Sequence, residues 1–243
     1  MVDNSVDEAI NGHANQIVVI LHKDLKSITV SDNGRGIPVE IKKPYNKSAL
    51  ELVLTTLHAG GKFSSAQYKY SGGLHGVGSS VVNALSSELV ATIKRDGFEW
   101  KQTYAQGRVK SPLTKEAATR GTGTTMFFRP DPVIFGDQSF SADVIRFRLD
   151  SKTYLHKGLK IVFKDEAGGT NETFEHEGGI VDFLAKVVKD RGKAATAPQV
   201  FYLQRDEPIG IEVAMQWTES HEEAIRSYVN GVPTTSGGSH EQG

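Results

Sequence analysis

The stretch SITVSDNGRGIP, residues 27–38, holds the change of pattern that decides the fold. Ile28 and Val30 alternate with polar residues, which predicts a half-buried strand, and the glycine-rich turn at 33–38 ends it. Asp32 continues the alternation of Ile28 and Val30, so its carboxylate is expected on the buried side of the sheet, where it needs hydrogen-bond donors. The exocyclic amino group of a purine would be such a donor. A turn aspartate that caps the bend after it is the alternative.

Outward from this strand, the pattern predicts helices that alternate with mostly hairpin-linked strands, an α+β sandwich of one sheet with helices on one face. Helices are expected at the start of the chain and at residues 47–58, 79–85, 142–152 and 180–189. Further strands are expected at residues 17–21, 88–94, 99–104, 124–129, 159–164, 199–203 and 209–217. The small polar segment 190–198 is the candidate linker.

The composition excludes several classes of protein. The chain has 243 residues, of which 38% are hydrophobic, and a formal net charge of −1, so a strongly basic nucleic-acid module is not expected. It has no cysteine, which excludes disulfides, thiolate catalysis and cysteine-ligated metal centres. It shows no apolar stretch long enough for a membrane span and no basic-then-apolar leader, so a cytoplasmic protein without membrane contact is expected.

The first residues predict a helix whose beginning is missing, because a helical pattern starts there without an N-cap residue. Asn4, Asp7 and Glu8 are spaced i, i+3 and i+4 and share one side of this helix. That side is either a solvated polar face or the floor of a ligand site, since amide and carboxylate oxygens suit magnesium.

The glycine-rich stretch at residues 71–78 leads directly into the helix expected at 79–85. Such a loop lets backbone N–H groups approach an anion such as a phosphate. It is not the common phosphate loop, because no Gly-Lys-Ser/Thr follows at the required spacing. It also fails the dinucleotide fingerprint, because Val81 stands where the third glycine belongs.

Together, residues 3–9, 32–38, 72–78 and 121–124 resemble the four ordered motifs of the GHKL ATPases. The sequence LHAGGKF at residues 57–63 is similar to the corresponding segment of the ATP-hydrolysing B subunits of bacterial type IIA DNA topoisomerases. This group includes DNA gyrase and topoisomerase IV. The resemblance implies a GHKL (Bergerat) α/β sandwich over residues 1–192. It also implies the start of a second, α/β transducer domain over 193–243.

The resemblance also implies a role for individual residues. Asn4 would coordinate a magnesium ion that bridges the ATP phosphates, and Asp32, supported by Thr124, would accept a hydrogen bond from adenine. Arg35 would pair with Glu8 at one edge of the pocket, and Arg95 lies where aminocoumarin inhibitors of the family make contact. The full set implied to bind ATP is Asn4, Asp7, Glu8, Asp32, Arg35, Gly36, Pro38, Tyr68, Gly73, Leu74, His75, Gly76, Val77, Gly78, Ser79 and Thr124.

The family's general base is a glutamate one helical turn before the residue matching Asn4, which falls immediately before Met1. No catalytic residue is therefore assigned within the chain, and the N-terminal arm of the family is also expected to be missing. The implied function is ATP-driven dimerisation coupled to DNA strand passage and changes in supercoiling. The implied partners are double-stranded DNA, a second copy of the ATP-hydrolysing subunit, and a DNA-cleaving A subunit in a heterotetramer with two copies of each. The alternatives are a nucleotide-binding fragment without turnover and another GHKL ATPase such as a MutL-like protein.

Overall fold

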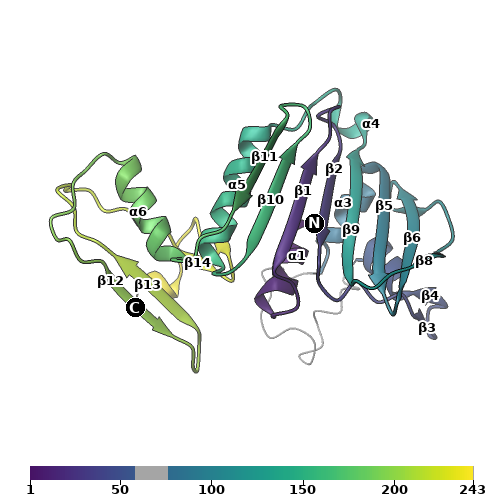
Figure 1. Ribbon diagram of the computed structural model, residues 1–243, viewed down its shortest axis with the longest axis horizontal. Coiled ribbons are helices and arrows are strands. Elements are labelled where there is room, and N and C mark those ends of the chain that lie inside the picture. Colours follow the sequence, from purple (N-terminus) through teal and green to yellow (C-terminus); the bar gives the residue numbers. More distant parts are fainter. Residues whose placement is uncertain (58–75, 243) are drawn as a thin grey trace.

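The computed structural model describes residues 1–57 and 76–242, and within them a nine-stranded sheet forms the centre of the molecule (Figure 1). Its strands run in the order β11-β10-β1-β2-β9-β5-β6-β7, with β8 paired to β6. Of the pairs in this sheet, β1 with β10 is parallel and the others are antiparallel. The strands are β1 (Gln16–Leu21), β2 (Ile28–Asp32), β5 (Ser86–Arg95), β6 (Phe98–Ala105), β7 (Arg108–Val109), β8 (Thr114–Ala118), β9 (Gly123–Pro130), β10 (Lys160–Asp165) and β11 (Thr170–Phe174).

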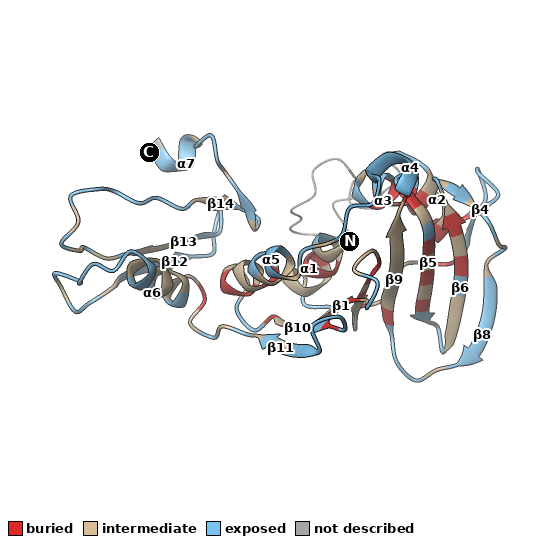
Figure 2. Ribbon diagram, turned by 90° about the horizontal axis from the view of Figure 1, so that it is seen from above, coloured by how far each residue is buried: buried red, intermediate tan, exposed pale blue. Residues whose placement is uncertain are grey.

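Helices cover one face of this sheet, so the fold has two layers (Figure 2). The helices are α1 (Val2–Ile10), α2 (Ala49–Thr55), α3 (Gly78–Ala84), α4 (Pro132–Phe135) and α5 (Ala142–Leu155). Strand β1 shows the consequence, because Ile17, Val19 and Leu21 are buried while the residues between them are half-buried. This confirms the expected α+β sandwich.

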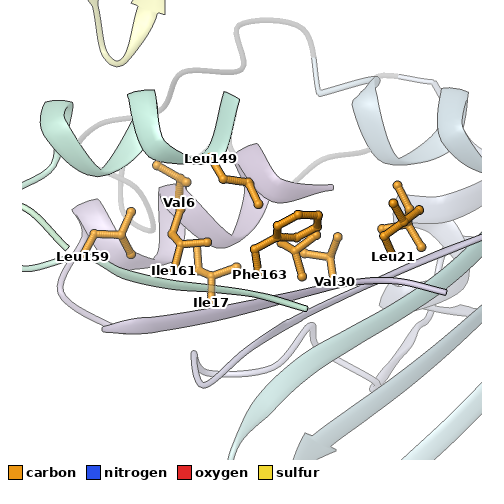
Figure 3. Packing of buried hydrophobic residues seen from close by; sticks show 10 residues of the cluster. Val6, Ile17, Leu21, Val30, Leu149, Leu159, Ile161 and Phe163 are labelled. Carbon is orange, nitrogen blue, oxygen red and sulfur yellow. The ribbon is translucent and has the colours of Figure 1, made fainter. Parts of the chain in front are cut away.

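The core lies between the helices and the sheet, in two apolar clusters. In the first, Val6 of α1 and Leu149 of α5 point down onto Ile17, Ile161 and Phe163 of the strands (Figure 3). The second lies under α2 and centres on Leu50, Leu54, Leu89, Ile93 and Tyr104. Helix α2 begins at the N-cap Ser48, whose Oγ accepts a hydrogen bond from the backbone N–H of Glu51 at 3.0 Å. The small hairpin β3 (Ile41–Lys42) and β4 (Lys47–Ser48) precedes it.

The C-terminal part forms a smaller group of elements beside the sheet (Figure 1). It contains α6 (Ile180–Asp190), β12 (Phe201–Arg205), β13 (Ile211–Met215), β14 (Tyr228–Val229), β15 (Val232–Pro233) and α7 (Ser239–Gln242). Strands β12 and β13 form an antiparallel hairpin in which every residue of β12 is exposed.

Most expected elements are present with shifted ends. The expected hairpin of β1 and β2 is antiparallel as predicted. The helix expected at 47–58 is shorter, because residues 47 and 48 form β4 and the helix starts only after the N-cap. The strand expected at 209–217 is limited to Ile211–Met215. Within the described part of the chain, no helix is long and apolar enough to cross a bilayer.

Candidate functional site

A cavity of about 410 Å³ lies between α1, the end of β2, α2 and the start of α3. The turn after β2 and the first residues of β9 complete its wall. It is lined by Met1, Asp3, Asn4, Ser5, Glu8, Val30, Asp32, Arg35, Gly36, Ile37, Pro38, Glu40, Lys42, Ala49, Leu52, Val53, Gly76, Gly78, Ser79, Arg95, Thr124 and Met126. Residues from all four predicted motif regions therefore meet in one place.

Asp32 lines this cavity together with the apolar side chains of Val30 and Met126. From the described residues its carboxylate accepts three hydrogen bonds: from the Ser5 hydroxyl at 2.7 Å, from the Gly34 N–H at 3.0 Å and from the Thr124 N–H at 3.2 Å. Burial raises the pKa of Asp32 above its ordinary value, against the effect of these donors. Because a carboxylate can accept about four hydrogen bonds, a ligand donor can still be accommodated.

The register of the sheet holds Asp32 in this position. Strand β2 pairs with β9 so that Asp32 lies opposite Thr124. Gly123 permits this close pairing: its φ is +147°, and a Cβ there would lie 2.2 Å from the Asp32 carbonyl oxygen. The Thr124 Oγ1 accepts the N–H of Ile37 at 3.3 Å, which ties the turn after β2 to the same strand.

Glu8 and Arg35 form one edge of the cavity. The guanidinium donates from Nη2 to Oε1 at 2.7 Å and from Nε to Oε2 at 3.1 Å, and the Arg35 backbone N–H also donates to Oε2 at 3.1 Å. Arg95 donates from Nη1 to the Gly36 carbonyl at 2.7 Å, which fixes the turn from its other side. The predicted pairing of Arg35 with Glu8 is therefore present.

Asn4 also lines the cavity and links α1 to α3. Its Nδ2 donates to the Ser79 Oγ at 2.6 Å. The described residues include no cluster of three or more His, Cys, Asp or Glu side chains suited to a metal ion. A site with so few protein ligands fits a magnesium ion that arrives bound to phosphates, because magnesium keeps several waters and takes few protein oxygens. The amide oxygen of Asn4 is a ligand of the required hard type.

The structure brings ten of the sixteen sequence-predicted site residues to the cavity wall. They are Asn4, Glu8, Asp32, Arg35, Gly36, Pro38, Gly76, Gly78, Ser79 and Thr124. Tyr68, Gly73, Leu74 and His75 lie outside the described residues.

Asp7 and Val77 do not line this cavity. Asp7 is buried, at 1% exposure, and the residues at the start of the chain that line the cavity are at positions 1, 3, 4, 5 and 8. Val77 is the N-cap residue of α3 and belongs to its backbone turn. Their predicted part in ATP binding stays a prediction.

Sequence reasoning missed Ser5 and most of the apolar wall, which includes Ile37, Val53 and Met126. Ser5 had a weak signal, because it lies beside Asn4 and one turn before Glu8 on the helical wheel. The residues of the apolar wall gave no sequence signal of a site, because each of them has the pattern of an ordinary core residue.

Two family models match the chain. The model described as "Histidine kinase-, DNA gyrase B-, and HSP90-like ATPase" matches residues 1–134, and the model described as "DNA gyrase B" matches residues 179–243. The first of these covers the whole described cavity.

Curated relatives match over essentially the full chain. The B subunit of DNA gyrase from Thermotoga maritima is 45% identical over 99% of this chain and 38% of its own length. The corresponding gyrase protein from Clostridium acetobutylicum is 42% identical over 100% and 38%, respectively. The B subunit of DNA topoisomerase 4 from Bacillus subtilis is 43% identical over 100% and 37%. The chain thus spans about two fifths of the length of these relatives.

A solved structure is similar over the whole fold. The 43K ATPase domain of Thermus thermophilus gyrase B, determined in complex with an aminocoumarin, superposes with a TM-score of 0.85 at 36% identity. The match covers 99% of this chain and 62% of that one.

Proposed function

Because this chain belongs to the family of histidine kinase-, DNA gyrase B- and HSP90-like ATPases, we propose that its cavity binds ATP. The single observation that carries the proposal is Asp32, a half-buried carboxylate that lines the cavity beside the apolar side chains of Val30 and Met126. Such a group is costly unless donors satisfy it, and the adenine amino group is a donor of suitable size. The apolar wall of Val30, Ile37 and Met126 supplies the surface that a flat base needs.

The same carboxylate favours adenine over guanine. At the position of the adenine amino group, guanine carries a carbonyl oxygen, which would face the Asp32 oxygens without a hydrogen between them. An acceptor opposed to an acceptor leaves both buried groups unsatisfied, which is the strongest basis for discrimination in such pockets. The Ser5 hydroxyl and the Gly34 and Thr124 amides already donate to Asp32 and hold it in this orientation.

The triphosphate would lie toward Asn4 and the start of α3, where Gly76, Gly78 and Ser79 line the cavity. Asn4 would hold magnesium, which when bound neutralises charge on the phosphate oxygens. Arg35, held by two side-chain hydrogen bonds to Glu8, would cover one edge of the nucleotide. Both Glu8 oxygens accept hydrogen bonds from Arg35, so Glu8 acts in positioning, and we assign no general base among the described residues.

At the level of the whole protein, we propose the ATPase part of the B subunit of a type IIA DNA topoisomerase, in which ATP binding drives dimerisation and DNA strand passage. The gyrase B and topoisomerase 4 relatives support this proposal. The partners it entails are double-stranded DNA, a second copy of the same subunit and a DNA-cleaving A subunit in a heterotetramer. With bacterial relatives and chromosomal DNA as the substrate, the proposed location is the cytoplasm.

We also propose that the first domain covers residues 1–192 and that a transducer domain begins at 193. The second family model, over residues 179–243, supports a separate unit in the C-terminal part and includes α6 in it.

Calorimetric titration of Asp32→Asn with a non-hydrolysable ATP analogue and magnesium tests the proposal. Asparagine keeps the shape but presents an N–H₂ group, which cannot accept from adenine. We expect affinity to fall by about 2–3 kcal/mol, or roughly 30- to 150-fold, with little effect on folding.

The matched control is Ser31→Ala, one residue earlier on the opposite face of β2, where the Ser31 hydroxyl bonds to the Thr125 hydroxyl at 2.8 Å. Its affinity should equal that of the parent chain. Equal affinities for the parent chain and Asp32→Asn would refute the adenine assignment.

A further inference from the structure

We infer that Ser79 is a positioning residue for Asn4, and that it determines how well the Asn4 amide can receive the magnesium ion of a bound nucleotide. The inference rests on the proposed function, because it gives Asn4 its role there. It gives the Ser79 side chain a role in which it would touch neither the metal nor the phosphates.

The contact joins two walls of the cavity that are far apart in the chain. Asn4 lies on α1 and Ser79 in the first turn of α3, 75 residues later, and the Nδ2 to Oγ distance is 2.6 Å. Ser79 is 8% exposed, so water competes little for its hydroxyl. Both residues line the same cavity.

The neighbouring serine does something different. The Ser80 hydroxyl donates to the Val77 carbonyl at 2.9 Å, within the first turn of α3, and Ser80 does not line the cavity. It is buried to a similar degree, at 6% exposure. Of these two adjacent serines, Ser79 therefore bonds across the cavity and Ser80 bonds within its own helix.

The chemistry of a primary amide explains how the Asn4–Ser79 bond would affect metal binding. An amide has a carbonyl oxygen, which can bind a cation, and an N–H₂ group, which cannot. When the oxygen faces a cation, the N–H₂ group needs an acceptor on its other side, and the Ser79 hydroxyl is placed to be that acceptor. A hydrogen bond donated by the amide nitrogen also increases the negative charge on the oxygen. Loss of such an outer partner typically lowers metal affinity by about 10- to 100-fold.

The test compares Ser79→Ala with Ser80→Ala by calorimetric titration with a non-hydrolysable ATP analogue, once with saturating magnesium and once with EDTA. Both substitutions keep the backbone N–H groups. With magnesium we expect the affinity of Ser79→Ala to fall by about 10-fold. With EDTA it should stay within about twofold of the parent chain, because the lost bond matters only when the metal is present. Ser80→Ala should match the parent chain in both conditions.

Two further variants sharpen the result. Ser79→Thr retains a hydroxyl at the same atom and should restore the dependence on magnesium. Asn4→Ala should lose that dependence, and adding Ser79→Ala to it should cause no further loss, because the pair acts as a unit.

The outcomes separate the inference from the proposed function. If Ser79→Ala equals Ser80→Ala with magnesium, or loses the same affinity with and without the metal, Ser79 only packs and the inference is overturned. If the parent chain binds the analogue with no dependence on magnesium, the metal role of Asn4 in the proposed function is overturned first and the inference with it.

Discussion

The two sides of helix α1 carry similar polar residues and meet different parts of the molecule. On the cavity side, Asn4, Ser5 and Glu8 each bond to a side chain of the cavity wall, namely Ser79, Asp32 and Arg35. On the side toward α5, Asp7 is buried and its charge acts on His156 at the end of that helix. Asp3 meets both parts, because it lines the cavity and also forms an ion pair with Lys152 of α5 at 2.6 Å.

The difference shows that the neighbour, and not the residue type, decides what a polar side chain does. His156 lies beside Gly231 in the turn between β14 and β15, so close that a Cβ on Gly231 would be 2.6 Å from Nε2. One side of α1 therefore shapes the nucleotide cavity. The other side lies near His156, where the end of α5 meets the turn between β14 and β15. Substitutions on the two sides should separate into effects on binding and effects on stability.

The largest effect on the α5 side is expected from His156. Burial and, to a smaller extent, the charge of Lys152 lower the pKa of His156 to about 4, while Asp7, Asp3 and Glu212 oppose the shift. The unfolded chain takes up this proton near pH 6.5 and the folded chain only near pH 4, so stability falls as the pH drops between these values. Between pH 7 and pH 5 we expect a loss of about 2 kcal/mol from this group, measured by urea unfolding.

His156→Gln should lose this part of the pH response, and His13→Gln should keep it, because His13 is an exposed residue beyond the end of α1. Nucleotide affinity at pH 7 should be the same in both variants. An identical pH response in His156→Gln and the parent chain would show that this histidine titrates normally when folded.

The sequence predicted the parts of the fold that depend on local patterns. The alternation of Ile28 and Val30 with polar residues located β2, the β-branched run at 17–21 located β1, and the helical spacing of the first apolar residues located α1. It did not predict β8, in which all five residues are exposed and no alternation exists. The parallel pairing of β1 with β10 could not be predicted from local patterns either, because the two strands are more than 130 residues apart in the sequence.

The candidate site was predictable where a residue's chemistry is unusual for its position. Asp32 on a buried face and the paired types of Glu8 and Arg35 gave such signals. Ser5 gave little signal, because its role depends on one bond to Asp32, 27 residues later. Asp7 was expected beside Asn4 because spacing alone cannot distinguish the stripe facing the cavity from the one beside it.

Glu8→Gln should have the next largest effect, on binding. Glutamine keeps the length of the side chain but loses the charge that holds the Arg35 guanidinium through two bonds. We expect nucleotide affinity to fall by about 5- to 10-fold, or about 1 kcal/mol, in the same titration. Asp7→Asn is the control from the other side of α1, and its affinity should stay within about twofold. If Asp7→Asn weakens binding as much as Glu8→Gln, the division between the two sides fails.

The smallest effect is expected from Lys152→Met, which keeps the apolar stem and removes the charge. The ion pair with Asp3 contributes at most about 0.5 kcal/mol at pH 7, because the Asp3 side chain is 68% exposed. The same charge helps to lower the pKa of His156, so its removal moves that pKa back toward the ordinary value. The difference in stability between pH 7 and pH 5 should therefore shrink by a few tenths of a kcal/mol in urea unfolding. A larger difference would mean that Lys152 acts on His156 through packing, since loss of a positive charge can only raise that pKa.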